Sequence, residues 1–525
     1  MQTGSTILSW ITFTPSIAML AIGVAMLLRP ALRFSKETLD QIARGLALVG
    51  AAVPVVLAIQ IWRGFDATTT GMQFVHRLSW IKAFNIEYYM GIDGLSVTLI
   101  LLTALVSFLA VIASMPWGIA ADDHHHFSRR SVPGYMVLIM LLETGMLGVF
   151  CSLDFFLFYV FWELMLLPMY FLIGIWGGPR REYAAIKFFL YTLAGSVLML
   201  LGMIALYFAG GHTFDLVKLA ALASEKALHL PAFFGDNVDS AKIVWTGMFI
   251  AFAIKIPMFP FHTWLPDAHV EAPTPISVIL AGVLLKMGIY GILRICYPVL
   301  PEATQWAQYG MAAFGVINIV YAAFVCMAQR DLKKLIAYSS VSHMGFCLLG
   351  MAAFTPQGIT GAVYQMFNHG IIASALFLIA GVVYDRAHHR EINGFGGLAK
   401  PMPEYTAFVG LAFMASLGLP GLNGFISEAL VFVGSFRTFT MLTVASALGV
   451  VITAAYYLWT LQRMFLGKVN EKYATITDLN WRERLTLYPL AVIMIVLGFY
   501  PMPIIDLMNK TLHALVLPLN GGVGL

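Results

Sequence analysis

Five ionisable side chains lie within long apolar stretches of this sequence: Glu143, Glu163, Lys255, Lys286 and Glu428. An ionisable group deep in a membrane-spanning helix costs roughly 2.5 to 3.5 kcal/mol on insertion scales unless it is paired or hydrated. Acidic and basic types occur in successive apolar stretches, which indicates a row of interacting groups. A row of this kind has the composition of a proton relay.

A relay works because the charge of a buried lysine depends on its neighbours. A nearby carboxylate keeps the lysine protonated, whereas burial without a partner favours the neutral amine. Moving the partner therefore switches the lysine between holding and releasing a proton. The alternative for Glu163 and Lys255 is a static buried ion pair, which leaves Lys286 unexplained. For Glu143, a packing role is an equally good interpretation.

Two apolar stretches carry helix-breaking residues close to these charges. Pro257 and Pro260 follow Lys255, and the segment ASLGLPGLNGFISEAL has Pro420 among several glycines before Glu428. Proline removes a backbone donor and frees carbonyl groups, where water or an ammonium group can bind. We therefore expect Lys255 to face a hydrated pocket at a helix break.

Histidines are the natural intermediates for protons near neutral pH. His343 and His369 both fall inside apolar stretches, and the polar residues nearby that could hold water are Ser339, Ser340, Ser342 and Asn368. A hydrogen-bonded packing role is the alternative for each. We expect His262 and His269 to anchor a loop. The run His124, His125 and His126 is interpreted as part of a solvated loop and not as a metal site.

The composition identifies the kind of protein that must hold these residues. The chain has 525 residues, 60% of them hydrophobic and 11% charged, with a mean hydropathy of +0.82, which excludes a soluble globular enzyme. Runs of about 20 apolar residues, each long enough to cross a bilayer, predict an all-α polytopic membrane protein. The fourteen expected helices lie near 7 to 28, 45 to 62, 93 to 116, 133 to 151, 153 to 175, 186 to 209, 243 to 264, 273 to 297, 307 to 328, 333 to 353, 361 to 384, 405 to 434, 440 to 465 and 486 to 507.

The two breaks predict an internal repeat. They fall in the seventh and twelfth helices. If helices 4 to 8 form one unit and helices 9 to 13 form a second, each break lies in the fourth helix of its unit. Paired breaks are typical of inverted-repeat transporters, although two unrelated proline kinks are the alternative. The connections are too short for a soluble domain. The predicted divisions are 1–132 (helices 1 to 3), 133–297 (first repeat), 305–465 (second repeat) and 466–525 (loop and helix 14).

Charge patterning predicts the orientation. Of the 31 lysines and arginines, 19 lie in loops that follow odd-numbered helices, and positive charge is held on the cytoplasmic side. Both termini should therefore face away from the cytoplasm. The net charge of +4 follows from this loop bias and gives no reason to expect nucleic acid. The sequence has no phosphate-binding glycine motif and no Cys-x-x-Cys pair, so we expect no cofactor or metal site in this chain.

Five segments resemble one known family: FWELMLLPMYFLIG (161 to 174), the block from 251 to 294, DLKKLIAYSSVSHMG (331 to 345), NHGIIASALFLIAGVVYDR (368 to 386) and ASLGLPGLNGFISEAL (415 to 430). They are similar to the antiporter-like subunits of respiratory complex I, the proton-translocating NADH:quinone oxidoreductase. Glu428 resembles the chain M (subunit four) type, because the sister subunits and the sodium/proton antiporters generally carry a lysine there. The length agrees, because chain L extends beyond fourteen helices.

The resemblance implies a role for each buried group. Glu163 and Lys255 would form the switch pair of the first half channel, and Lys286 and His343 would connect the halves. Glu428 would be the exit-side carrier, with His369 in the second half channel. No residue of this chain would do redox chemistry.

The resemblance also implies a setting for the subunit. It would be a translocase subunit in the bacterial cytoplasmic membrane, beside the sister chains L and N, driven by quinone reduction elsewhere in the complex. NADH, FMN, iron–sulfur clusters and quinone would be held by partner subunits. A subunit of a multisubunit sodium/proton antiporter is the closest alternative. A haem- or quinone-binding oxidoreductase using His343 and His369 and a purely structural membrane anchor are more distant ones.

Overall fold

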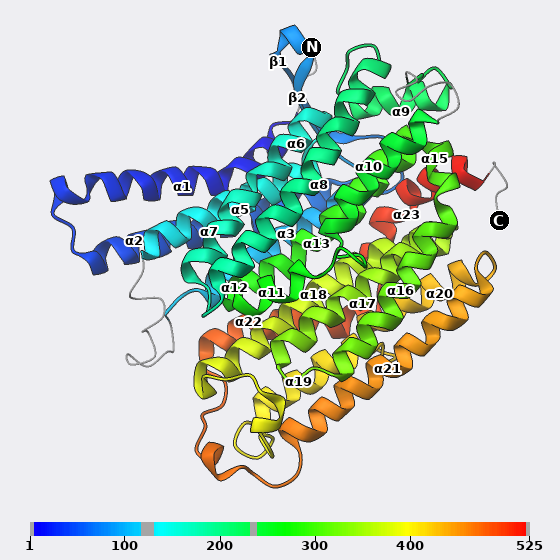
Figure 1. Cartoon of the computed structure of the whole chain (residues 1–525). Helices are drawn as coiled ribbons and strands as arrows, with labels where there is room; N and C mark the ends of the chain where they lie inside the picture. Colours follow the sequence, from blue (N-terminus) through cyan, green and yellow to red (C-terminus); the bar gives the residue numbers. More distant parts are fainter. Residues whose placement is uncertain (1–4, 117–130, 231–238, 521–525) are drawn as a thin grey trace.

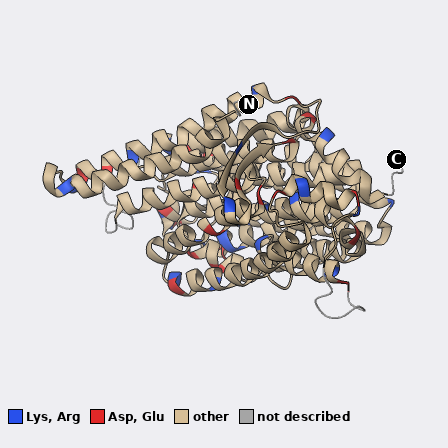
Figure 2. Ribbon diagram, turned by 90° about the horizontal axis from the view of Figure 1, so that it is seen from above, with Lys and Arg blue, Asp and Glu red and all other residues tan. Residues whose placement is uncertain are grey.

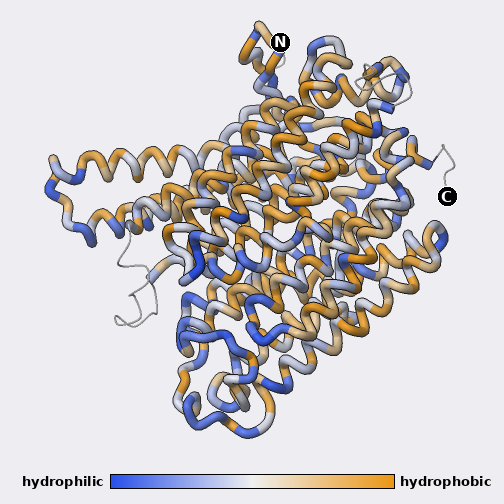
Figure 3. Tube along the Cα trace, in the orientation of Figure 1, coloured by the Kyte–Doolittle hydropathy of each residue, from blue (hydrophilic) through white to orange (hydrophobic). Residues whose placement is uncertain are grey.

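The computed structural model of this chain describes residues 5–116, 131–230 and 239–520. The described part is a bundle of long helices with one small β-hairpin at its edge (Figure 1). The predicted histidine loop at 124 to 126 lies outside the described residues. Hydrophilic residues are concentrated at the ends of the helices and in the connections, and hydrophobic residues lie along the lengths of the helices (Figure 3).

Eleven helical stretches in the described ranges are long and apolar enough to cross a membrane. Each coincides with one of the predicted helices, so the prediction of a polytopic helical membrane protein is confirmed. The eleven are α1 (Ile7–Leu32), α2 (Lys36–Gly64), α3 (Gly94–Ala113), α5 (Val132–Cys151), α6 with α7 (Phe155–Leu164 and Leu166–Trp176), α8 (Arg181–Ala209), the stretch Thr274–Val299, α16 (Gln308–Met327), α17 (Leu332–Ala352), α18 (Pro356–Ala387) and α21 (Thr440–Phe465).

The three predicted helices outside this set are the seventh, twelfth and fourteenth, and all three are interrupted. The seventh is α10 (Ser240–Lys255), an irregular turn, and α11 (Trp264–Glu271). The twelfth is α19 (Pro403–Ser416) and α20 (Asn423–Phe436). The two predicted helix breaks are therefore confirmed, at the positions that the prolines and glycines indicate. Because each piece is short, the number of uninterrupted spans is lower than fourteen.

The prediction of a single fourteenth helix over 486 to 507 is wrong. The structure has α22 (Trp481–Phe499) and α23 (Met502–Val516), which meet at an angle of 67°. Pro501 and Pro503 explain the bend, because prolines lack the backbone donor that would continue the first helix and are favoured at the start of the next. If this bent pair counts as one span, the described part of the chain has twelve candidate membrane spans.

The prediction of an all-α chain is also wrong in one connection. The segment between α2 and α3, expected as a polar loop, forms an antiparallel hairpin of β1 (Gln73–Ile81) and β2 (Ile86–Ile92). Asn85 provides the left-handed residue of its turn. One face of β2 is buried against the bundle, where Leu153 donates its N–H to the carbonyl of Tyr89. The hairpin is visible at the top of Figure 1.

The eighth predicted helix is continuous but not uniformly α-helical. It consists of α12 (Thr274–Ile279), a π-helical turn at Leu280–Leu284, α13 (Leu285–Gly291), a second π-helical turn at Ile292–Cys296, and α14 (Tyr297–Val299). Lys286 lies between the two π-helical turns. Such turns widen the backbone spiral and occur often at functional sites.

The remaining elements are short connections. They are α9 (Leu216–Ser224), α15 (Pro301–Trp306) and the short 3₁₀ turns Lys82–Phe84, Ile392–Gly394, Glu471–Tyr473 and Leu517–Asn520.

The best-enclosed spans are Thr274–Val299, α18 and α17. Residues facing outward on α1, α2 and α8 are largely apolar and exposed, as expected of lipid-facing helices. Charged residues lie at helix ends and, in smaller number, inside the bundle (Figure 2). Both ends of the chain lie at the end of the bundle opposite the α1–α2 turn (Figure 1).

Candidate functional site

Glu428 and His343 meet inside the bundle. The Oε1 atom of Glu428, on α20, lies 3.4 Å from Nδ1 of His343, on α17. Both residues are buried. A side chain added at Gly418, in the break before α20, would come within 2.6 Å of the Glu428 carboxylate. The carboxylate therefore lies against the break of this helix, whose left-handed turn at Gly418 (φ +77°) requires glycine.

Lys286 and His369 form the second contact. The Lys286 Nζ atom lies 2.8 Å from His369 Nδ1 and donates a further bond to the carbonyl of Ala281, in the first π-helical turn. His369 lies on α18, and its ring centre is 5.5 Å from that of His343. Lys286, His369, His343 and Glu428 therefore form a continuous buried row, which we call the central row.

A small cavity lies between the last three members of the central row. It is lined by His343, His369 and Glu428 together with Gln365, Ile372, Ala415, Ser416 and Gly424. In this conformation the cavity is too narrow to admit a water molecule. Direct contact between side chains is therefore the connection that this conformation provides.

Polar side chains hold the acidic end of the row. Gln365 Nε2 lies 3.3 Å from His343 Nδ1, and Ser427 donates to the Gln365 side-chain oxygen at 2.5 Å. On the other side of the ring, His343 Nε2 lies 3.0 Å from Ser416 Oγ. Ser416 donates to the hydroxyl of Tyr457 (2.9 Å), which donates to Ser339 (3.0 Å).

Sequence reasoning singled out Ser339 but missed Gln365, Ser416 and Tyr457. Gln365 lies four residues before His369, one helical turn away, so helical spacing from a named histidine was the available signal. Ser416 and Tyr457 come from other helices. Their proximity depends on packing that a sequence does not show.

Lys255 is the last residue of α10 and lies at the break itself. Its side chain is buried, and its Nζ lies 4.9 Å from the centre of the Trp162 ring, a cation–π contact. The ring of Trp162 is held by a hydrogen bond to Ser196 (3.2 Å). As the final residue of a helix, Lys255 also lies near unpaired carbonyls, which favours positive charge.

Glu163 lies beside Trp162 on α6 and is partly buried. In the described chain, no ion pair shorter than 4.0 Å joins Glu163 to Lys255, and the Glu163 Oε1 atom has no hydrogen-bond partner. A static ion pair is thus not the arrangement in this conformation.

The break after Lys255 is held by a residue that sequence reasoning missed. Asn318, on α16, accepts a hydrogen bond from the N–H of Phe259 (2.8 Å), and its side-chain amide lies 3.4 Å from the carbonyl of Pro257. Asn318 is fully buried. It therefore satisfies backbone groups that the interrupted helix leaves unpaired.

Close packing brings the break next to Lys286. A side chain added at Gly288, on α13, would lie 2.6 Å from the carbonyl oxygen of Phe252 and 2.5 Å from Ile256. Gly288 is two residues after Lys286, and Ile256 directly follows Lys255. The glycine thus lets α10 and α13 approach at the level of both lysines.

Glu143 lies on α5 and is fully buried. Neither of its carboxylate oxygens has a hydrogen-bond partner. An ionised carboxylate without partners is strongly disfavoured in such a site, so the neutral acid is the form that this conformation favours. Glu143 is separate from the central row in this structure.

The remaining predicted residues are distributed as follows. Pro257 and Pro260 lie in the turn between α10 and α11, and Pro420 lies between α19 and α20. The expected link between Lys286 and His343 runs through His369, which touches Lys286 directly. His269, expected to anchor a loop, lies within α11 and is fully buried.

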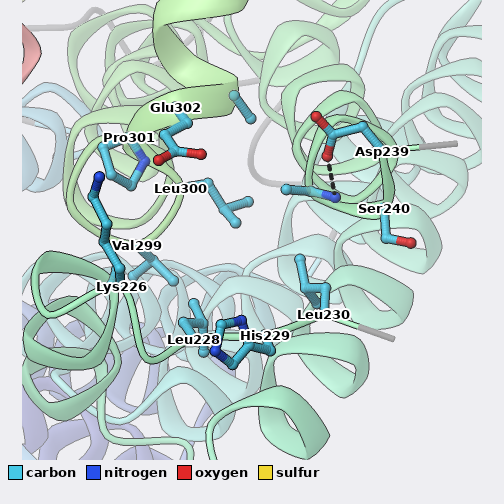
Figure 4. A pocket seen from close by; sticks show the side chains of 13 residues that line it. Lys226, Leu228, His229, Leu230, Asp239, Ser240, Val299, Leu300, Pro301 and Glu302 are labelled. Carbon is cyan, nitrogen blue, oxygen red and sulfur yellow. Dashed lines mark hydrogen bonds between the residues drawn. The ribbon is translucent and has the colours of Figure 1, made fainter. Parts of the chain in front are cut away.

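One pocket at the edge of the bundle lies away from these residues. It opens where α9, α10 and α14 end or begin, and it is lined by charged and apolar side chains that include Lys226, His229, Asp239 and Glu302 (Figure 4). No member of the central row lines this pocket, nor does Lys255. This pocket is therefore separate from the central row and from Lys255.

Comparison with known proteins identifies the family. Residues 152–453 match the family described as NADH:quinone oxidoreductase/Mrp antiporter, TM. A protein described as NADH-quinone oxidoreductase subunit M from Rhodobacter capsulatus is 41% identical over 520 residues, which is 99% of this chain and 98% of the relative. This chain belongs to that family.

Solved structures agree with this assignment. A chain of respiratory complex I from Thermus thermophilus superimposes with a TM-score of 0.83 at 28% identity, covering 98% of this chain and 99% of that chain. A chain of the Mrp complex from Dietzia has the same fold, with a TM-score of 0.81, 19% identity and coverage of 99% and 100%. The full-length similarity to subunit M confirms the predicted chain M type.

Proposed function

We propose that Glu163, Lys255, Lys286, His369, His343 and Glu428 carry protons through this subunit of a proton-translocating NADH:quinone oxidoreductase. The observation that carries the proposal is the central row, in which Lys286 touches His369 and His343 touches Glu428. The members of the central row are buried groups of types that can hold and release protons, and each lies close to the next. The Mrp-type alternative shares the fold and the family description, but the Mrp-complex chain is 19% identical to this chain, whereas the subunit M relative is 41% identical.

The steps follow from the contacts. A proton on the Lys286 ammonium passes to His369 Nδ1, and the neutral amine remains. The His369 imidazolium then releases its proton to the neighbouring His343 ring, and His343 passes it to Glu428. Lys286 is recharged from Lys255, which holds or releases its own proton as Glu163 moves nearer or farther. Glu143 is proposed as a further acid of the first half.

The architecture that we propose for this function counts each broken helix as one crossing. This gives fourteen crossings, with inverted repeats at 133–297 and 305–465, an N-terminal region at 1–132 and a C-terminal region at 466–525. The two breaks, one beside Lys255 and one beside Glu428, support this division. We also propose that both chain ends face away from the cytoplasm of a bacterium. Their common position at one end of the bundle supports a shared side (Figure 1), and the excess of lysine and arginine in loops after odd-numbered helices supports the choice of that side.

The proposed partners are the sister chains L and N, and the proposed energy source is quinone reduction in another part of the complex. NADH, FMN, iron–sulfur clusters and quinone belong to those partners in this proposal. Neighbouring genes test the assembly: reading frames for chains L and N support complex I, whereas small antiporter subunits support the sodium/proton alternative.

Measurement of proton translocation by the assembled complex tests the relay. We expect Lys255→Ala and Glu163→Ala to abolish translocation by this subunit while the complex still assembles. Lys510→Ala is the matched control, because this exposed lysine bonds only the carbonyl of Thr68. Normal ratios of protons to electrons in both assembled variants would overturn the proposal.

A further inference from the structure

His269 is a buried histidine, and its contacts do not explain why a histidine is present at this position. Neither ring nitrogen has a hydrogen-bond partner, although the residue is fully enclosed. The ring stacks on Phe377 of α18 at a centroid distance of 4.3 Å. An unpaired buried polar group costs roughly 1 to 3 kcal/mol, so stacking alone would be provided better by phenylalanine.

Lys333 lies on one side of His269. Its Nζ donates to the carbonyl of Ala272 at 2.5 Å, and Ala272 caps the end of α11 one helical turn after His269. The Lys333 side chain comes from the first turn of α17 and is buried. A potential proton donor therefore lies at the end of α11, about one helical turn along the chain from the unpaired imidazole.

Partly exposed charged residues surround the outer side of Lys333. Arg390 lies 3.1 Å from Asp331, two residues before Lys333, and donates to the carbonyl of Val270. The Asp331 side chain is 32% exposed. Lys333 thus connects the buried histidine to a charged, accessible end of the bundle.

Lys286 lies on the other side of His269. The bond from its Nζ to the carbonyl of Ala281 turns the lysine side chain toward the N-terminal end of its span. One turn farther in that direction, Ser277 donates its hydroxyl to the carbonyl of His269 (3.0 Å).

We propose that Lys333 and His269 form an uptake branch that delivers protons from the loop end of α11 and α17 to Lys286. The inference rests on the proposed function of the central row. The Lys333 ammonium gives a proton to one nitrogen of neutral His269 and becomes an amine. The imidazolium gives the proton from its other nitrogen to the neutral amine of Lys286. Lys333 then regains a proton from solvent at the charged end.

Substitution of His269 in the whole complex tests the branch. His269→Phe keeps the stacking on Phe377 and removes both nitrogens, and Lys333→Met removes the donor while keeping its apolar stem. We expect each to slow proton translocation at least about tenfold, while NADH oxidation by a soluble electron acceptor stays normal. His262→Phe is the matched control, because His262 is a buried histidine of the same segment that stacks on Phe259 instead.

The outcomes separate this inference from the proposed function. If Lys255→Ala stops translocation but assembled His269→Phe and Lys333→Met translocate at the normal rate, the branch is overturned and the central row stands. If none of the three variants affects translocation, the row and its branch both fall. If the complex with His269→Phe does not assemble, Lys333→Met distinguishes the same outcomes. Lys333 lies in the first turn of α17, and the substitution keeps the apolar part of its side chain. Equal slowing in His262→Phe also overturns the branch.

Discussion

The carboxylate of Glu428 and the imidazole of His343 face each other across 3.4 Å at the break of an interrupted helix. The contact links α20 to α17, and through the ring of His369 it reaches Lys286 on a third helix. An acid at the end of a row of bases provides a proton acceptor for that row. Glu428 lies beside the break of its helix, where the regular backbone hydrogen bonds are interrupted. Its carboxylate can therefore approach side chains that a continuous helix would keep at a distance.

Replacement of this acid should stop transfer at the end of the row. We expect Glu428→Gln to slow proton translocation at least about tenfold, because the amide keeps the shape and loses the exchangeable proton. Glu404→Gln is the control: Glu404 lies on α19, the other half of the same broken helix, but forms an ion pair with Arg484 near the surface. Translocation in reconstituted vesicles, driven by NADH, distinguishes the two. A normal rate in Glu428→Gln would remove Glu428 from the pathway.

The sequence predicts the spans and the charged members of the site well, for a physical reason. A charge in an apolar run is conspicuous because its insertion is costly, so Lys255, Lys286 and Glu428 can be recognised without a structure. Pro257 and Pro420 likewise mark the breaks, since proline cannot continue helical hydrogen bonding.

Pairing between helices was not predictable in the same way. Which histidine touches Lys286 depends on how α13 and α18 rotate against each other, and no local pattern encodes this. Asn318 and Tyr457 are polar residues of ordinary type in apolar helices, and only their partners show their roles. The β-hairpin was missed because it lies in a polar connection between two spans, and its strands lack a regular alternation of buried and exposed residues.

Gly288 sets the spacing between the two lysines, so its replacement should disturb coupling between them. Gly288→Ala would place a methyl group 2.6 Å from the carbonyl of Phe252 and force α10 away from α13. Overpacking of this kind costs about 1 to 3 kcal/mol. We expect slower proton translocation and a lower unfolding temperature of the complex.

Gly310 provides the comparison for this substitution. It lies on α16, and a side chain added there would meet nothing within 4 Å. Gly310→Ala should leave translocation unchanged. If both alanine variants behave alike, the approach of α10 to α13 does not matter for coupling.

Asn318 stabilises the turn after Lys255, so we expect Asn318→Leu to destabilise the protein. The substitution leaves the N–H of Phe259 without its acceptor, at a cost of about 1 to 3 kcal/mol. Thermal unfolding of the detergent-solubilised complex measures the loss. Gln329→Leu is the control, because Gln329 lies near the end of the same helix and bonds only a carbonyl of its own turn. Equal unfolding temperatures for the wild type and Asn318→Leu would show that the break does not depend on this amide.

The stability with which the β-hairpin is attached to the bundle should depend on pH through Asp154. Its carboxyl group caps α6 by accepting the N–H of Leu157 (3.0 Å), and it also accepts the N–H of Glu87 from β2 (3.1 Å). Burial raises the pKa of Asp154 to about 6, whereas an aspartate in an unfolded chain titrates near about 3.9. The folded state therefore binds the proton more tightly than the unfolded state does.

The sign of the pH effect follows from this shift. The stabilisation that the raised pKa contributes is complete below about pH 4 and is lost as the pH rises through about 6. Hydrogen exchange of β2, corrected for the intrinsic rate, should show weaker protection at pH 7.5 than at pH 5. Asp154→Asn cannot ionise, so protection in this variant should be the same at both pH values. A pH dependence that persists in Asp154→Asn would assign the effect to another group.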